Sequence, residues 1–207
     1  MAKVISAKDE TVRLFKSDFM EFFTHVSWWI PLLLYVPLLP YFVWKSLPNT
    51  TLVLFATWAL IGFGVWSLTE YTLHRFVFHF HPKSKRLQRI FYTLHEIHHD
   101  YPSDSTRLVM PPILSIPLAF LFYLLFSWIF VPGIFEPFYI GFGLGYLSYD
   151  MTHYALHHLS FKSSWWKFLK KYHLQHHFQE QDRAFGVFSP VWDYVFRTQA
   201  RRLGAEK

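Results

Sequence analysis

The sequence lacks cysteine and is poor in charge. None of its 207 residues is a cysteine, which excludes disulfides, thiolate zinc sites, cysteine-ligated iron–sulfur clusters and cysteine nucleophiles. Charged residues make up 16% of the chain, compared with about 25% in an average soluble domain. Apolar residues make up 52% and aromatic residues 22%, more than one core of this size can bury. The composition therefore argues against a disordered chain and against an ordinary soluble domain.

Long apolar runs take the place of charge and predict an all-α membrane protein. Each run is close to the roughly 20 residues that a helix needs to cross a bilayer. The first run holds Pro31, Pro37 and Pro40, so we expect it to be kinked or broken, which neighbouring helices tolerate in a membrane. We expect one domain over residues 1–207, with four transmembrane helices at about 26–47, 51–73, 112–131 and 134–154.

The positive charges are distributed unevenly about these spans. Four crossings place the polar segments 1–25, 74–111 and 155–207 on one side, together with 19 of the 20 Lys and Arg residues. Only Lys45 lies on the other side. This is the positive-inside pattern, which predicts a cytosolic helical cap. The net charge of +6 then needs no nucleic-acid partner to explain it.

The segment before the first span has its own helical pattern. Asp18 and Glu21 are spaced as a capping box, and apolar residues such as Phe19 and Phe22 recur at helical spacing. We interpret residues 18–25 either as a short helix on the membrane surface or as the first turns of the next helix.

Ten of the 13 histidines form four short groups, and the pattern H-x-x-H-H occurs twice. Residues three and four apart share one face of a helix, whereas His74 and His79 are five apart and need a bend, a helix end or a wide turn. The groups lie at span ends and in the polar segments that follow, so all can meet at the cytosolic face. They are His74 and His79, His95 with His98 and His99, His153 and His157, and His173 with His176 and His177.

Ten neutral imidazoles suit two first-row transition metals with about five ligands each, and favour Fe, Zn or Cu over Mg or Ca. We interpret His25, His81 and His158, which fall outside the repeated spacings, as solvated or hydrogen-bonded residues. A histidine-rich metal store or transporter is the alternative from another class. Transporters place ionisable ligands near the membrane midplane, whereas these histidines cluster at one side.

Longer motifs surround the histidines. They are the stretches Glu70 to His79, His95 to Asp104 as H-x-x-H-H-x-x-P-x-D, Arg107 to Pro112, Gly145 to His158, Lys171 to Phe178, and Phe185 to Thr198. With these motifs the chain resembles the fatty acid hydroxylase/sterol desaturase superfamily of histidine-box membrane di-iron oxygenases, and within it the fatty acid 2-hydroxylases. Glu96 departs from the glycine expected in the second box. Many relatives also carry a fused cytochrome b5 domain, where this sequence has only a short polar arm.

The resemblance implies an O₂-dependent oxidoreductase that places a hydroxyl on C2 of a fatty acyl chain, in a ceramide or another membrane lipid. It implies that the ten grouped histidines hold two Fe ions, which Zn can replace on purification, although which five bind which metal stays open. Hydroxylation and desaturation begin with the same hydrogen abstraction. A sterol oxidase, a carotenoid hydroxylase and a lipid desaturase therefore remain alternatives.

The resemblance also implies partners and a location. The electrons would come from a separate carrier of the cytochrome b5 or ferredoxin type, together with its reductase. The short polar arm favours a bacterial inner membrane, with the endoplasmic reticulum as the location in a eukaryote.

Several residues beside the histidines are further candidates. Asp150, three residues before His153, is predicted to accept an imidazole N–H, or else to be an interfacial helix-end charge. Tyr149 is predicted to line the substrate entrance, and Asp104 to pair with Arg107. The aromatic-rich run 184–198 either covers the site or anchors at the interface. Glycines at 62–64 and 141–145 predict close helix packing.

Overall fold

The computed structural model describes residues 4–201, and within that range the chain is helical with no β-strand. Two of the short elements, η2 and η3, are π-helical, and η1 is a 3₁₀ turn. The elements are α1 Asp18–Phe22, α2 Ile30–Tyr35, α3 Leu38–Ser46, η1 Leu47–Asn49, α4 Leu52–Thr72, η2 Leu73–Phe78, α5 Lys85–Phe91, η3 Tyr92–Glu96, α6 Ile97–Asp100, α7 Pro112–Ile129, α8 Phe135–His158, α9 Ser164–Phe178 and α10 Val191–Val195. The helical fold class predicted from the sequence is confirmed.

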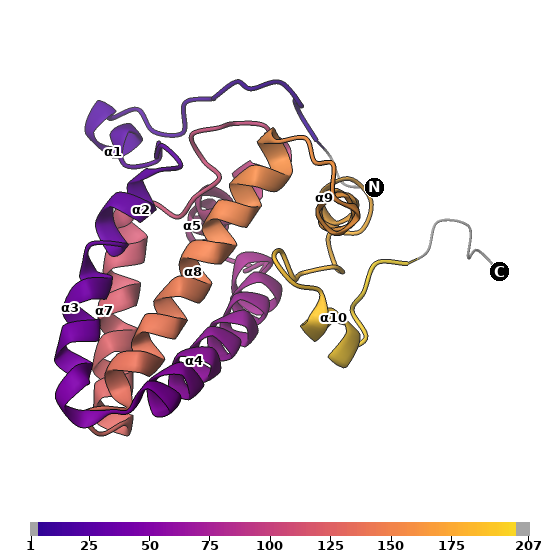
Figure 1. The fold of residues 1–207 in the computed structure, drawn as a ribbon. Coiled ribbons are helices and arrows are strands. Elements are labelled where there is room, and N and C mark those ends of the chain that lie inside the picture. Colours follow the sequence, from indigo (N-terminus) through magenta and orange to yellow (C-terminus); the bar gives the residue numbers. More distant parts are fainter. Residues whose placement is uncertain (1–3, 202–207) are drawn as a thin grey trace.

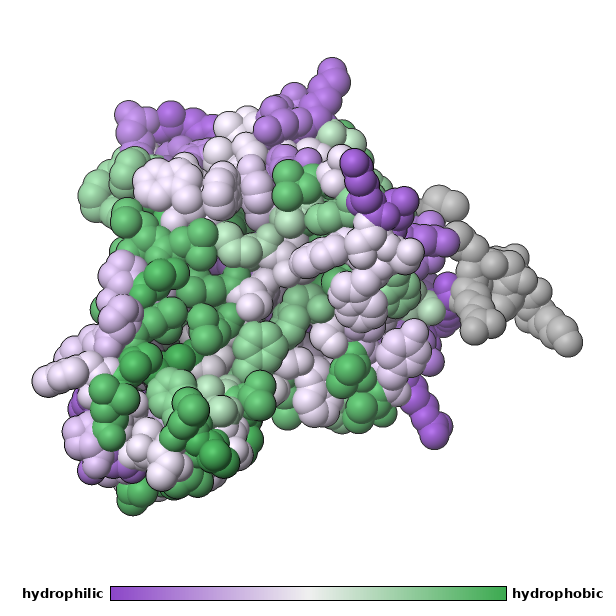
Figure 2. All heavy atoms as spheres, viewed as in Figure 1, coloured by the Kyte–Doolittle hydropathy of each residue, from purple (hydrophilic) through white to green (hydrophobic). Residues whose placement is uncertain are grey.

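Three stretches of this fold are long and apolar enough to cross a membrane, namely Ile30–Asn49, Leu52–Phe78 and Pro112–Ile129. The first is divided between α2 and α3 at Pro37, as its prolines predicted. Apolar side chains cover the surface over these helices, and hydrophilic residues gather at one end of the molecule (Figure 2). This division separates an apolar part, which contains the three candidate spans, from a hydrophilic part.

Helix α8 is the central helix of the bundle, with 15 of its 24 residues buried. It packs closely along α4 because both helices carry glycines where they meet. A Cβ atom on Gly141 would lie 1.8 Å from the carbonyl oxygen of Ala59, and one on Gly62 would lie 2.0 Å from that of Phe138. Gly64 and Gly143 have open space beside them. The predicted close packing thus holds for some of these glycines but not for all.

The two ends of the bundle differ. At one end the connection after α7 lies against the connection after α3. Gly133 (φ 88°) permits this close approach, since a Cβ atom at this position would lie 2.3 Å from the Asn49 carbonyl oxygen. Lys45 and Glu136 form an ion pair of 3.6 Å there. The other end carries the N-terminal arm, α5 and α9 (Figure 1), and all four histidine groups belong to elements of that end.

The N-terminal arm corrects one detail of the sequence interpretation. Helix α1 begins at Asp18, but its cap is Ser17, whose hydroxyl accepts the Met20 N–H at 3.5 Å. The predicted capping box is wrong because the chain before the helix folds back over it. The Glu21 carboxylate therefore accepts the N–H groups of Leu14 and Phe15 at 2.9 and 2.8 Å.

Candidate metal centre

The ten grouped histidines converge in two sets of five. Within each set, one ring nitrogen from every histidine lies within 4.8 Å of the others. The first set comprises His74, His79, His95, His99 and His176, and the second set comprises His98, His153, His157, His173 and His177. The structure thus divides the ten histidines into two sets of five, a division that the sequence did not predict.

Each H-x-x-H-H box contributes to both sets. In the second box His95 and His99 enter the first set while His98 enters the second. In the fourth box the assignment is reversed, because His173 and His177 enter the second set. Residues four apart share a helix face, whereas adjacent residues point about 100° apart. The reciprocal two-plus-one division therefore follows from helix geometry.

A π-helical turn resolves the five-residue spacing of the first box. The His79 N–H donates to the His74 carbonyl at 3.3 Å, which is the i to i+5 bond of a π-helix. The wider turn brings the two imidazoles together, with their Nε2 atoms 3.2 Å apart. The predicted need for a wide turn is confirmed.

The spacing of the ring nitrogens fits metal ions. Nε2 atoms are 3.0 Å apart for His79 and His176, and 2.9 Å apart for His98 and His153. Nitrogens about 2.1 Å from one ion and at right angles would lie about 3.0 Å apart. The donor type and the spacing both suit a first-row transition metal.

The electrostatics keep these imidazoles neutral. Burial, and then the neighbouring histidines, hold the pKa of His95, His98, His99, His173 and His177 well below its usual range. Burial likewise lowers the pKa of His79 to about 2, and that of His176 to about 3. A neutral imidazole has a lone pair available for a metal.

Backbone carbonyls orient three of the rings. The Nδ1 atom of His74 donates to the Phe185 carbonyl at 2.5 Å, and that of His176 donates to the Arg183 carbonyl at 2.6 Å. In the second set His153 Nδ1 donates to the Leu108 carbonyl at 3.0 Å. A carbonyl only accepts, so Nδ1 carries the proton and the Nε2 lone pair faces the set. Sequence reasoning missed these partners because a carbonyl has no residue-type signal.

The segment 183–187 owes its position to two buried carboxylates. Asp193 accepts the N–H groups of Phe185 and Gly186 at 3.0 and 2.8 Å. Glu70 in α4 accepts the Val187 N–H at 2.7 Å. The start of the run 184–198 therefore lies at the site, whereas Tyr194 and Phe196 are 57% and 48% exposed, so each of the two interpretations fits one part of the run.

The two non-histidine candidates lie beside the second set. Asp150 forms no hydrogen bond with a histidine among the described residues, so the predicted bond is wrong. The loop before α7 passes this face of α8, where its Leu108 carbonyl takes the His153 proton and its Met110 N–H donates to Asp150 at 3.4 Å. Tyr149 stacks on His153 with ring centroids 5.8 Å apart.

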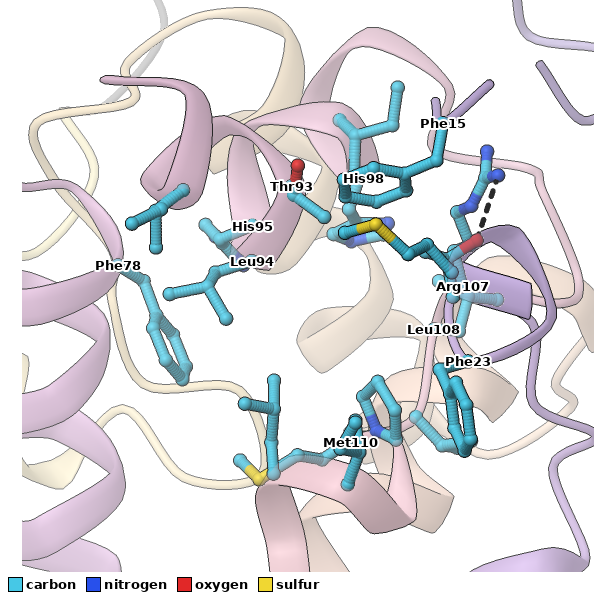
Figure 3. A pocket seen from close by; sticks show the side chains of 18 of the residues that line it. Phe15, Phe23, Phe78, Thr93, Leu94, His95, His98, Arg107, Leu108 and Met110 are labelled. Atoms are coloured by element: carbon cyan, nitrogen blue, oxygen red, sulfur yellow. Dashed lines mark hydrogen bonds between the residues drawn. The ribbon is translucent and has the colours of Figure 1, made fainter. Parts of the chain in front are cut away.

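A cavity of about 600 Å³ opens onto both sets. It reaches His95 of the first set and His98 and His153 of the second, and Tyr149 also lines it. Figure 3 shows the apolar side chains that make up most of its wall. They come from the N-terminal arm, η2, η3 and the loop before α7, and include Phe15, Phe23, Phe78, Leu94, Leu108 and Met110.

A polar cluster closes one side of this cavity. Arg107, whose side chain is 4% exposed, pairs with Glu21 at 2.8 Å and with Asp104 at 3.3 Å. The predicted pairing of Asp104 with Arg107 is confirmed. His25 bonds the Thr106 hydroxyl at 2.8 Å, and like His81 and His158 it belongs to neither set.

Comparisons with known proteins agree with this site. The fatty acid hydroxylase family model matches residues 59–198. The chain is 43% identical to a dihydroceramide fatty acyl 2-hydroxylase of Arabidopsis thaliana, over 91% of this chain and 80% of that protein. It is 34% identical to the human fatty acid 2-hydroxylase over 90% of this chain, and spans 56% of that longer protein.

A solved structure is also similar. The hydroxylase domain visible in full-length scs7p superposes with a TM-score of 0.84 at 36% identity, and the match covers 89% of this chain and 70% of that one. The resemblance found in the sequence motifs is therefore confirmed, and the chain belongs to the fatty acid hydroxylase family.

Proposed function

We propose that this protein is an O₂-dependent fatty acyl 2-hydroxylase. The observation that carries the proposal is the pair of five-histidine sets facing one apolar cavity, in a chain similar to proteins named as 2-hydroxylases. The reaction converts a C2–H bond, O₂, two electrons and two protons into a C2–OH group and water.

The ten histidines would hold two Fe ions, which supply the oxidising power for hydrogen abstraction from carbon. Zn binds imidazole at least as well as Fe(II) does, so purified protein can carry Zn at the same positions. The protein's own contribution is to hold the imidazoles, exclude water and direct the chain.

The cavity fits an alkyl chain, since apolar side chains make up most of its wall. The substrate would be the acyl chain of a ceramide or of another membrane lipid. Arg107 lines the cavity, and its Nε atom has no partner among the described residues. We assign to it the polar end of the substrate, which would place C2 near His98 and His153. Tyr149 would position the chain beside them, and Asp150 would support the loop that holds His153.

We further propose that this single domain crosses the membrane four times. Helix α8 would be the fourth span, since its 24 residues extend about 36 Å. The histidine end carries the basic polar segments and would face the cytosol. The similar proteins from Arabidopsis thaliana and human lend no support to a bacterial inner membrane over the endoplasmic reticulum.

A lipid profile tests this function. The chain would be expressed in a host that lacks 2-hydroxy acids but supplies cytochrome b5, and its lipids analysed by mass spectrometry. New 2-hydroxy acyl lipids are expected with the unsubstituted chain and with His81→Ala, but not with His176→Ala. A new double bond, or a hydroxyl at another carbon, would contradict 2-hydroxylation and favour another oxidase of the superfamily.

A further inference from the structure

Helix α9 has two chemically different faces. One face carries His173, His176 and His177, which are fully buried. The opposite face carries Lys167 and Lys171, and residues 160–179 contain no acidic residue to neutralise them. Lys167 and Lys171 on this face are exposed. Neither the metal site nor the substrate cavity uses them.

This basic face of α9 surrounds an apolar hollow. The hollow has a volume of about 510 Å³, and Leu174 and Phe178 line it together with Lys167 and Lys171. Phe178 is 41% exposed. Lys170 is held in place because its amine donates to the Leu159 carbonyl at 2.7 Å. An apolar centre with a charged rim is the arrangement of a protein-binding surface.

The basic face is also close to both histidine sets. Lys171, Leu174 and Phe178 lie on the side of the helix opposite His173, His176 and His177, and an α-helix with its side chains is about 10 Å across. His173 and His177 belong to the second set and His176 to the first. A protein bound to this face would therefore be separated from His173, His176 and His177 only by the width of α9.

A second basic helix, α5, has a different character. Residues 82–94 contain Lys83, Lys85, Arg86 and Arg89 and no acidic residue. However, Leu87 and Ile90 of α5 are 44% and 52% exposed. Exposed apolar residues beside cationic side chains are typical of a helix that lies in a membrane interface. Lys83 and Lys85, just before and at the start of α5, therefore provide a matched control of equal charge.

We propose that the basic face of α9 (Lys167, Lys171, Leu174 and Phe178) docks an acidic one-electron carrier protein. This inference rests on the proposed function, whose turnover consumes two electrons. Each docked carrier is oxidised by one electron, so two docking events supply the two electrons. These electrons, two protons, O₂ and the substrate C–H bond give one C–OH group and one water. Opposite charges at the rim increase the association rate and select the acidic partner.

Equilibrium binding tests the docking surface without turnover. The full chain in nanodiscs of neutral lipid would be titrated with the soluble haem domain of cytochrome b5 and, separately, with an acidic [2Fe–2S] ferredoxin. Lys167→Glu/Lys171→Glu is expected to raise the Kd of the carrier about tenfold at low salt, and the difference should shrink near 0.5 M salt as charges are screened. The matched control Lys83→Glu/Lys85→Glu should leave the Kd within about twofold.

Lys167→Gln/Lys171→Gln removes the charges without reversing them and should give an intermediate Kd. An equal Kd in all variants would overturn the proposal, and so would the failure of both carriers to bind the unsubstituted chain. A loss of binding to phosphatidylserine vesicles, with carrier binding unchanged, would assign this face to the membrane instead.

The two proposals fail separately. Carrier binding that depends on α9 but yields no 2-hydroxy lipid would reject the function and keep the surface. Product from chemically reduced protein, with carrier binding insensitive to α9, would reject the surface and keep the function.

Discussion

The two histidine sets have the same number of ligands but different support. In the first set, the carbonyls of Phe185 and Arg183 bind the outer nitrogens of His74 and His176. In the second set only the Leu108 carbonyl plays this part, for His153. The Nδ1 atoms of His98, His173 and His177 are buried without a partner among the described residues. The protein therefore fixes the first set more firmly than the second.

The second set is in turn more open to the substrate cavity. His98 and His153 both line it, whereas His95 is the one member of the first set that does so. Of the three rings beside the cavity, only His153 is held by a backbone carbonyl of the described residues, that of Leu108. We infer that the second set, in which three rings lack an outer partner in this part of the chain, changes more than the first set when the acyl chain binds.

The largest expected effect comes from removing one ligand of either set. His74→Ala and His177→Ala should each abolish 2-hydroxy lipid formation, because five imidazoles no longer surround one ion. Mass spectrometry of the lipids provides the measurement. His81→Ala is the control, since that side chain is 77% exposed and belongs to neither set. Full activity in either ligand variant would contradict the claim that all five histidines of its set are needed to hold a metal ion.

Loosening the carbonyl support should affect the first set selectively. Asp193→Asn weakens the bonds that hold Phe185 and Gly186. Loss of such outer partners typically lowers metal affinity about 10–100-fold. Competition with a chelator should then remove one metal ion readily and the second at its usual rate. Equal weakening of both ions would show that the sets are not supported separately.

Narrowing the cavity should impair catalysis but not metal binding. Leu94→Trp places a larger side chain in the wall and should lower turnover several-fold, most strongly for long acyl chains, at a packing cost of about 1–3 kcal/mol. Leu87→Trp is the control, because Leu87 does not line the cavity and is 44% exposed. Unchanged chain-length preference, measured by competition between acyl substrates, would contradict the assignment of this cavity.

The smallest effect concerns the N-terminal arm, which Glu21 ties to the cavity wall. Burial raises the pKa of Glu21, but bonds from Phe15, His25 and Leu14 outweigh this and leave it below 4.5. Since the folded pKa is lowered, the carboxylate stabilises the attached arm above pH 4.5, and this contribution is lost as the pH falls through the lowered value. At neutral pH the full stabilising contribution of the Glu21 carboxylate is therefore present.

Glu21→Gln should release the arm at neutral pH. Tryptic cleavage after Lys16, which is exposed, should then be several-fold faster, because a hydrogen bond to a charged group contributes about 1.5–3 kcal/mol. Glu10→Gln, on an exposed part of the arm, is the matched control. Equal cleavage rates would mean that other contacts hold the arm.

The sequence predicted the helical class and the ten histidines, because spacing on a helix is a local property. It also predicted that His74 and His79 need a wide turn, and a π-helix provides it. The division into sets depends on where α9 lies relative to η2 and α6, which is tertiary. The bond predicted for Asp150 failed for a similar reason, since a carbonyl from a distant loop lay closer to His153.

The metal-to-chain ratio of purified protein, measured by elemental mass spectrometry, tests the central claim most directly. The account predicts two first-row metal ions per chain in the unsubstituted protein. It also predicts close to one in His74→Ala and in His177→Ala. A ratio of one in the unsubstituted protein, or of two in both variants, would contradict a centre built from two sets of five histidines.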